Sequence, residues 1–177
     1  MTSSAYVTAA LILAAAQSVP VATDPLGPAR SGQLQCFSPD TSRKVCNALA
    51  AYTLGPAGAV QVRGDILMAP ASLLIVMRTS TSVEVRSGAV CGRVRARDIE
   101  AATFTIAGRP VPQQMVQLAS PQILSVMRSH LNQEICATFV PNGPGFTTQV
   151  TIDGAARPDI SDTFIWVRPN EGYAVGP

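Results

Sequence analysis

Apolar and polar residues alternate over several short stretches of the chain, and most of these stretches end at a turn signal. This alternation is typical of strands that bury one face. Residues 73–77 are apolar throughout, as expected of a strand buried on both faces. The predicted strands are 60–68, 73–77, 82–86, 90–97, 101–106, 135–140, 147–152 and 163–167.

Two segments show helical spacing of their apolar residues instead. The longer one, 121–134, has proline at its first position, which is favoured in the first turn of a helix. The apolar stripe comprises Ile123, Leu124, Met127, Leu131 and Ile135. The shorter one, 42–52, places Val45, Leu49 and Tyr52 on one face. We therefore expect an α+β fold, in which about six strands form an antiparallel sheet and the longer helix covers one of its faces.

Four cysteines predict two disulfides if the protein is exported. The chain has no C-x-x-C pair and only one histidine, so it lacks zinc-site spacing. Three ways of pairing remain open from sequence alone. Locality favours Cys36 with Cys46, which leaves Cys91 to pair with Cys136.

The spacing of three cysteines raises the possibility of an internal repeat. Cys46, Cys91 and Cys136 are evenly spaced, and each precedes an alternating run that ends at a glycine. Repeats of this period are a mark of arrayed folds. Glycines are also common in the turns that follow strands, so both interpretations stay open.

The N-terminus resembles an export signal. Residues 5–16 form a short, alanine-rich apolar run, and small residues permit cleavage after Ala16 or Ser18. No lysine or arginine precedes the run, so an uncleaved apolar segment is the alternative. The run is short for spanning a bilayer. We expect a signal peptide over 1–18, a flexible lead-in over 19–35, one globular domain over 36–177 and no stable membrane span after cleavage.

Composition and the absence of certain motifs narrow the range of possible functions. Charged residues make up 14% of the chain and the net charge is +2, so electrostatics do not favour a nucleic-acid partner. The sequence contains no glycine-rich phosphate loop and no G-x-S-x-G elbow. Because zinc-site spacing is also absent, and Asp153, Asp159 and Asp162 lack the regular alternation of a calcium loop, we expect no metal ion and no cofactor.

The densest group of basic residues is the candidate binding site. Arg93, Arg95 and Arg97 alternate with apolar residues, and alternate residues of a strand share one face. Guanidinium groups bind phosphate and carboxylate well, so this face is a candidate anion site. The plainer alternative is a solvated strand face, because Asp98 and Glu100 follow and can neutralise it.

The candidate catalytic pair is His130 with Glu134. The two residues are four positions apart on the predicted helix, where a carboxylate can orient an imidazole base. A histidine beside a carboxylate is more often an ordinary surface feature.

These observations identify no specific reaction. The leading hypothesis is a periplasmic or secreted, non-enzymatic domain that binds an anionic envelope component or another exported protein. The alternative is a hydrolase of an envelope polymer that uses His130 and Glu134. A third possibility is a purely structural or inhibitory module.

Overall fold

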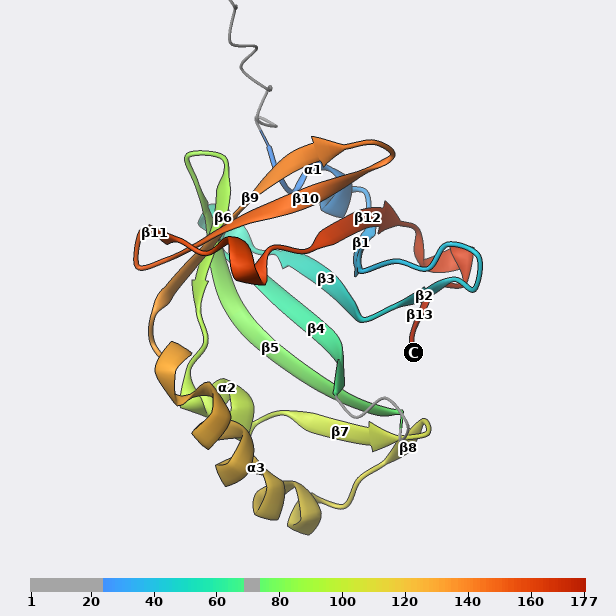
Figure 1. Ribbon diagram of the computed structural model, residues 1–177, viewed down its shortest axis with the longest axis vertical. Helices are drawn as coiled ribbons and strands as arrows, with labels where there is room; N and C mark the ends of the chain where they lie inside the picture. The colour runs from blue at the N-terminus through green and yellow to red at the C-terminus, as the bar shows by residue number, and fades with distance from the viewer. Residues whose placement is uncertain (1–23, 69–73) are drawn as a thin grey trace, which may run out of the picture.

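The computed structural model describes residues 24–68 and 74–177. In that part of the chain, eight strands form a closed antiparallel barrel (Figure 1). Each strand pairs with the next barrel strand along the chain, and the last one pairs back with the first. The barrel strands are β1 (Leu34–Phe37), β3 (Ala48–Leu54), β4 (Val60–Met68), β5 (Ile75–Arg86), β6 (Ala89–Arg93), β9 (Glu134–Asn142), β10 (Gly145–Ile152) and β12 (Thr163–Val167).

The expected α+β fold is therefore wrong. A sheet that closes on itself covers its own inner face, so it needs no helix as a lid. The predicted strands are largely confirmed, but 75–77 and 82–86 belong to the single long strand β5, and residue 73 of the predicted strand 73–77 lies outside the described residues. The predicted signal peptide lies outside the described residues.

Aromatic rings fill the interior of the barrel. Phe164 on β12 lies opposite Phe37 on β1 and Phe146 on β10, and directly opposite residues of paired strands share one face. Its ring centroid is 5.5 Å from that of Phe37, 5.2 Å from that of Phe146 and 4.9 Å from that of Phe139. Phe164 is 1% exposed, so this cluster forms the centre of the core.

The helix α1 (Gly27–Arg30) packs against one end of the barrel. Leu26 and Ala29 are buried in the same core cluster as Val60 and Val90. Val60 is the first residue of β4, and Val90 is the second residue of β6. The sequence predicts a flexible lead-in over 19–35, without packed structure. The structure corrects this expectation for residues 24–35, because apolar side chains in that segment complete the core.

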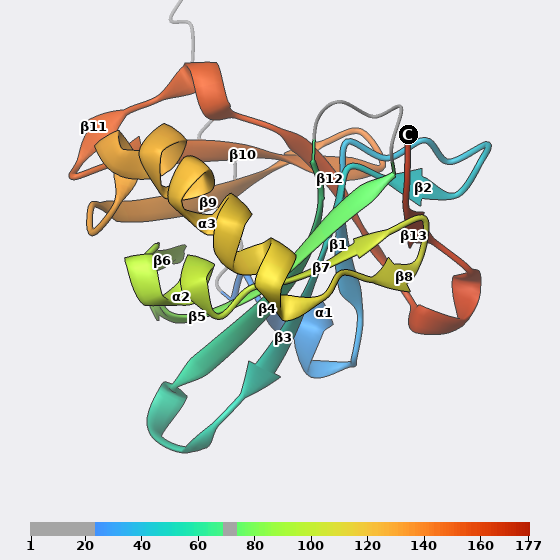
Figure 2. The same cartoon turned by 90° about the horizontal axis from the view of Figure 1, so that it is seen from below.

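The chain leaves the barrel between β6 and β9. This excursion contains α2 (Ala96–Glu100), β7 (Thr103–Ile106), β8 (Arg109–Pro110), α3 (Gln113–Met127) and η3 (Arg128–His130). Strand β7 pairs with the first part of β5, and α3 lies over this extension of the sheet (Figure 2). A second core forms here around Met77, Phe104 and Val116.

Both predicted disulfides are present, Cys36–Cys46 and Cys91–Cys136. Cys36 is buried in a third cluster, which includes Val167 and Cys46 of the short strand β2 (Val45–Cys46). Strand β13 (Ala174–Val175) runs parallel to β2. Cys46 thus lies outside the barrel sheet, whereas Cys91 and Cys136 face each other on β6 and β9. The three evenly spaced cysteines are not equivalent, so the structure does not support the repeat.

The predicted helix over 42–52 is wrong. That segment forms β2 and most of β3, which pairs with β1 on one side and β4 on the other. Tyr52 shares a face with Val62 of β4, while Leu49 joins the outer cluster around Cys36. The apolar spacing fits a helix locally, but pairing with distant strands decides the conformation.

The predicted helix over 121–134 is displaced. Helix α3 begins eight residues earlier, at Gln113, and ends at Met127, so Pro121 lies inside it. Ile135, the last member of the predicted stripe, instead belongs to β9. The remaining short elements are the 3-10 helices η1 (Pro56–Gly58), η4 (Pro158–Ile160) and η5 (Pro169–Glu171) and the strand β11 (Ala155–Ala156), which pairs with β10.

Candidate anion-binding site

The candidate site lies where β6 separates from β5. The two strands pair from Val83 to Arg86 on β5, joined by a tight turn at Ser87 and Gly88, which both have positive φ. The rest of β5 continues along β4, whereas the chain after Arg93 turns away and enters α2. This divergence leaves a gap in the barrel wall.

Gly92 allows the close approach of the strands at the edge of this gap. A Cβ atom at this position would lie 2.8 Å from Cγ1 of Val83 and 3.2 Å from the backbone oxygen of Ser82. A contact of 2.8 Å is shorter than van der Waals separation allows. Glycine is therefore needed here for space.

Asp98 fixes the direction in which the chain turns away. Its Oδ2 accepts hydrogen bonds from the backbone N–H of Arg95 (3.1 Å) and from the hydroxyl of Thr81 (3.0 Å). The hydroxyl of Thr79 donates to the Asp98 backbone oxygen (3.1 Å). These bonds join the start of α2 to β5 across the gap, so the position of Arg95 is defined.

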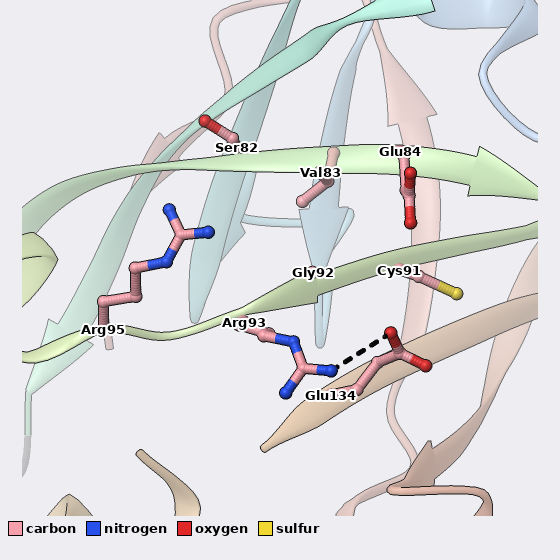
Figure 3. A pocket seen from close by; sticks show the side chains of 8 residues that line it. All are labelled: Ser82, Val83, Glu84, Cys91, Gly92, Arg93, Arg95 and Glu134. Atoms are coloured by element: carbon pink, nitrogen blue, oxygen red, sulfur yellow. Dashed lines mark ion pairs between the residues drawn. The ribbon is translucent and has the colours of Figure 1, made fainter. Parts of the chain in front are cut away.

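The gap forms a pocket of about 270 Å³ (Figure 3). Three elements contribute to its wall: β5, β6 with the residues after it, and the start of β9. Figure 3 shows the Arg95 guanidinium pointing toward β5 and the Arg93 guanidinium pointing toward Glu134. The lining residues are Ser82, Val83, Glu84, Cys91, Gly92, Arg93, Arg95 and Glu134.

The two glutamates already have arginine partners. Glu134 Oε1 is 2.6 Å from Nη2 of Arg86 and 3.6 Å from Nη2 of Arg93. Glu84 Oε1 is 2.8 Å from Nε of Arg86. Arg93 also donates from Nη1 to the backbone oxygen of Asn132, at 2.6 Å. This network holds Arg93 at the pocket rim and provides its guanidinium with both an ion-pair partner and a hydrogen-bond acceptor.

Arg95 is different, because its guanidinium forms no ion pair with any described residue. The side chain is half-buried, and burial makes a charge without a partner costly. The two lining arginines and Arg86 face two glutamates, so one positive charge in the pocket is left uncompensated. An anion with two oxygen atoms in one plane matches the donor geometry of this guanidinium.

The structure brings together two of the three predicted arginines. Strand β6 ends at Arg93, so the expected ridge of three guanidinium groups on one strand does not form. Arg97 lies on α2, where its side chain is 72% exposed and its Nε is 3.8 Å from Oδ1 of Asp98. Alternation alone could not predict the end of the strand at Arg93. The path of the chain after Arg93 depends on the hydrogen bonds between Asp98 and the threonines of β5.

The proposed catalytic pair does not form. His130 is on η3 and Glu134 begins β9, so the two are not on one helix. No hydrogen bond or ion pair joins them in the described part of the chain. The orientation of a base by Glu134 therefore lacks support.

Sequence reasoning did not identify Ser82, Glu84 and Gly92 as part of the site. A signal for Gly92 was available, since glycine inside a strand often marks a close backbone approach. Within residues 24–68 and 74–177, no group of histidine, cysteine and acidic side chains is arranged to hold a metal ion. None of the helices in those ranges has the length and apolar character needed to cross a bilayer.

Comparisons with protein-family models, with curated proteins and with solved structures find no match for this chain. The interpretation of the pocket therefore rests on its own geometry and charge.

Proposed function

We propose that this protein is an exported, non-enzymatic binding domain that holds an anionic group of an envelope component or of another exported protein at Arg95. The observation that carries the proposal is the half-buried Arg95 guanidinium, which lines a pocket without an ion-pair partner among the described residues. The proposed ligand group is a carboxylate or a phosphate, since both accept two parallel hydrogen bonds from arginine.

The rigidity of the surroundings supports a binding role. The Cys91–Cys136 disulfide joins β6 to β9 next to the pocket, and Asp98 holds the backbone of Arg95. A side chain that extends from a fixed backbone has fewer conformations to lose when its ligand binds. Two disulfides are also consistent with a periplasmic or extracellular location, where disulfides persist.

The test compares Arg95→Gln with Arg97→Gln. Both variants remove one positive charge, but only Arg95 lines the pocket. Inorganic phosphate and acetate are titrated separately, and the backbone amide NMR shifts of Gly92, Arg93 and the residue at position 95 are followed. We expect saturable shifts in the wild type and in Arg97→Gln, with binding weakened by at least about ten-fold in Arg95→Gln.

Two results would contradict the proposal. One is equal anion affinity in the wild type and in Arg95→Gln. The other is an equal loss in both variants, which would indicate a general effect of net charge rather than a site.

A further inference from the structure

Helix α3 exposes apolar side chains away from the core. Met115, Leu118 and Val126 are 58%, 76% and 82% exposed. With Gln122 they are spaced by three, four and four residues, which places them on one stripe of the helix. Val116, Ser120 and Ile123 lie on a different face, which packs against β5 and β7. The exposed stripe is thus a second apolar surface that the fold does not use.

An apolar groove lies beside the stripe. It has a volume of about 240 Å³ and runs between the C-terminal half of α3 and the extended part of β4 and β5. Gln122 and Val126 belong both to the stripe and to the groove, so the two form one surface. The groove is lined by Met68, Met77, Gln122, Ile123, Val126 and Met127.

The charges around α3 have a simple arrangement. Residues 111–127 contain no ionisable side chain, and exposed arginines flank this segment at Arg109 and Arg128. Neither arginine forms an ion pair with another described residue. Glu100 lies next to Gln113 and Gln117, on the side of the helix opposite the stripe. The stripe is therefore bracketed by positive charges, with no negative charge on its own face.

We propose that α3 docks on an anionic lipid surface, with Met115, Leu118 and Val126 in the interface and with Arg109 and Arg128 against the headgroups. Apolar side chains flanked by cations suit the boundary between acyl chains and anionic headgroups. Figure 1 shows α3 at the opposite end of the molecule from α1, the first helix of the described chain.

A second copy of the chain fits this surface less well. If two α3 helices packed about a two-fold axis, Arg109 of one would approach Arg128 of the other, or each arginine would approach its equivalent. Either arrangement places like charges together, which is unfavourable. Three side chains are also a small part of the roughly 20 to 30 residues that each partner of a stable protein interface typically contributes, on the order of 800 Å².

The experiment places a fluorescent reporter on the stripe. Tryptophan is introduced as Leu118→Trp, with Ile160→Trp as the control at another exposed apolar position, on η4. The protein is purified from its native host and mixed with phosphatidylcholine vesicles, with and without brominated phosphatidylglycerol. Bromine quenches only tryptophan that enters the acyl region. We expect additional quenching, relative to the wild type, in Leu118→Trp and none in Ile160→Trp.

A second measurement tests the role of charge. Arg109→Gln with Arg128→Gln is expected to weaken sedimentation with phosphatidylglycerol vesicles by on the order of ten-fold. The same change at Arg63 and Arg168 serves as the matched control, because both are exposed, form no ion pair with another described residue and are distant in sequence from α3. Because the local reporter is on α3, binding through residues 1–23 would not imitate the expected quenching.

Three outcomes would overturn the proposal. The first is the absence of additional quenching in Leu118→Trp with the vesicles that contain brominated phosphatidylglycerol. The second is quenching at position 160 that equals quenching at position 118. The third is self-association in analytical ultracentrifugation that Leu118→Ser abolishes, which would assign the stripe to a second copy.

Discussion

At the scale of single residues, two positions show how closely the barrel is packed. Gly92 brings β6 against Val83, and Tyr52 donates a hydrogen bond to Oε1 of Gln35 inside the barrel. Gln35 is fully buried, and its Nε2 has no hydrogen-bond partner among the described residues. Each position therefore leaves little room for substitution.

Gly92→Ala is expected to lower the free energy of unfolding by about 1–3 kcal/mol, since overpacking displaces neighbouring atoms. Gly64→Ala is the matched control on β4, because a Cβ atom there would be 3.7 Å from its nearest neighbour, Ile66. Urea denaturation of both variants measures the difference. Equal stability of the two variants would show that the Gly92 contact is not tight.

Tyr52 is expected to make stability depend on alkaline pH. Burial raises the pKa of its phenol above the ordinary value. The unfolded chain therefore loses this proton first, and its contribution to stability is complete below about pH 10. Above that pH, the free energy of unfolding of the wild type should fall more steeply than that of Tyr52→Phe. Parallel pH profiles for the two proteins would contradict this assignment.

At the scale of elements, the disulfides join different parts of the structure. Cys36–Cys46 ties β1 to the short strand β2, whereas Cys91–Cys136 joins the two strands on either side of the excursion. The second pair closes a much longer loop, with a sequence separation of 45 against 10. In the chain-entropy model, a longer loop gives greater stabilisation.

Replacing both cysteines of a pair with serine is expected to lower the free energy of unfolding. The decrease should be about 3 kcal/mol for Cys36–Cys46 and about 4 kcal/mol for Cys91–Cys136. Denaturation under non-reducing conditions gives both values. A larger loss from the Cys36–Cys46 pair would mean that packing around Cys36, rather than loop length, dominates.

At the scale of the whole molecule, the barrel is closed by segments from both ends of the described chain. Strand β1 pairs with β12, and Arg43 donates to the backbone oxygen of Pro177 at 2.8 Å. The Cys91–Cys136 disulfide joins two barrel strands and the Cys36–Cys46 disulfide ties the barrel to β2, and both fit the proposed export. The location remains a proposal that the mass of the native protein can test.

We expect the intact mass of protein from its native host to lack the first 16 or 18 residues. After alkylation without reductant, it should carry no label, because all four cysteines are paired. A full-length, labelled chain would contradict both export and the oxidised state.

Strand ends, turns and the basic segment show how much of the fold and of the site could be predicted from the sequence. Alternation located β4 and β12 with correct ends, and turns follow β5 and β10 at Ser87-Gly88 and Asp153-Gly154. It also identified the basic segment that contributes Arg93 and Arg95 to the pocket. It did not predict that Arg97 would lie outside the strand. That position depends on the hydrogen bond from the Thr81 hydroxyl to Asp98, which joins segments apart in the sequence.

The sequence by itself determined where most strands and turns lie, and it favoured the correct cysteine pairs, because alternation, turn residues and short loops are local properties. Only the tertiary structure decided that the sheet closes into a barrel, that 45–52 forms strands instead of a helix, and that Arg95 lines a pocket. These features depend on hydrogen bonds and side-chain packing between segments far apart in the chain, and such contacts override local helical spacing.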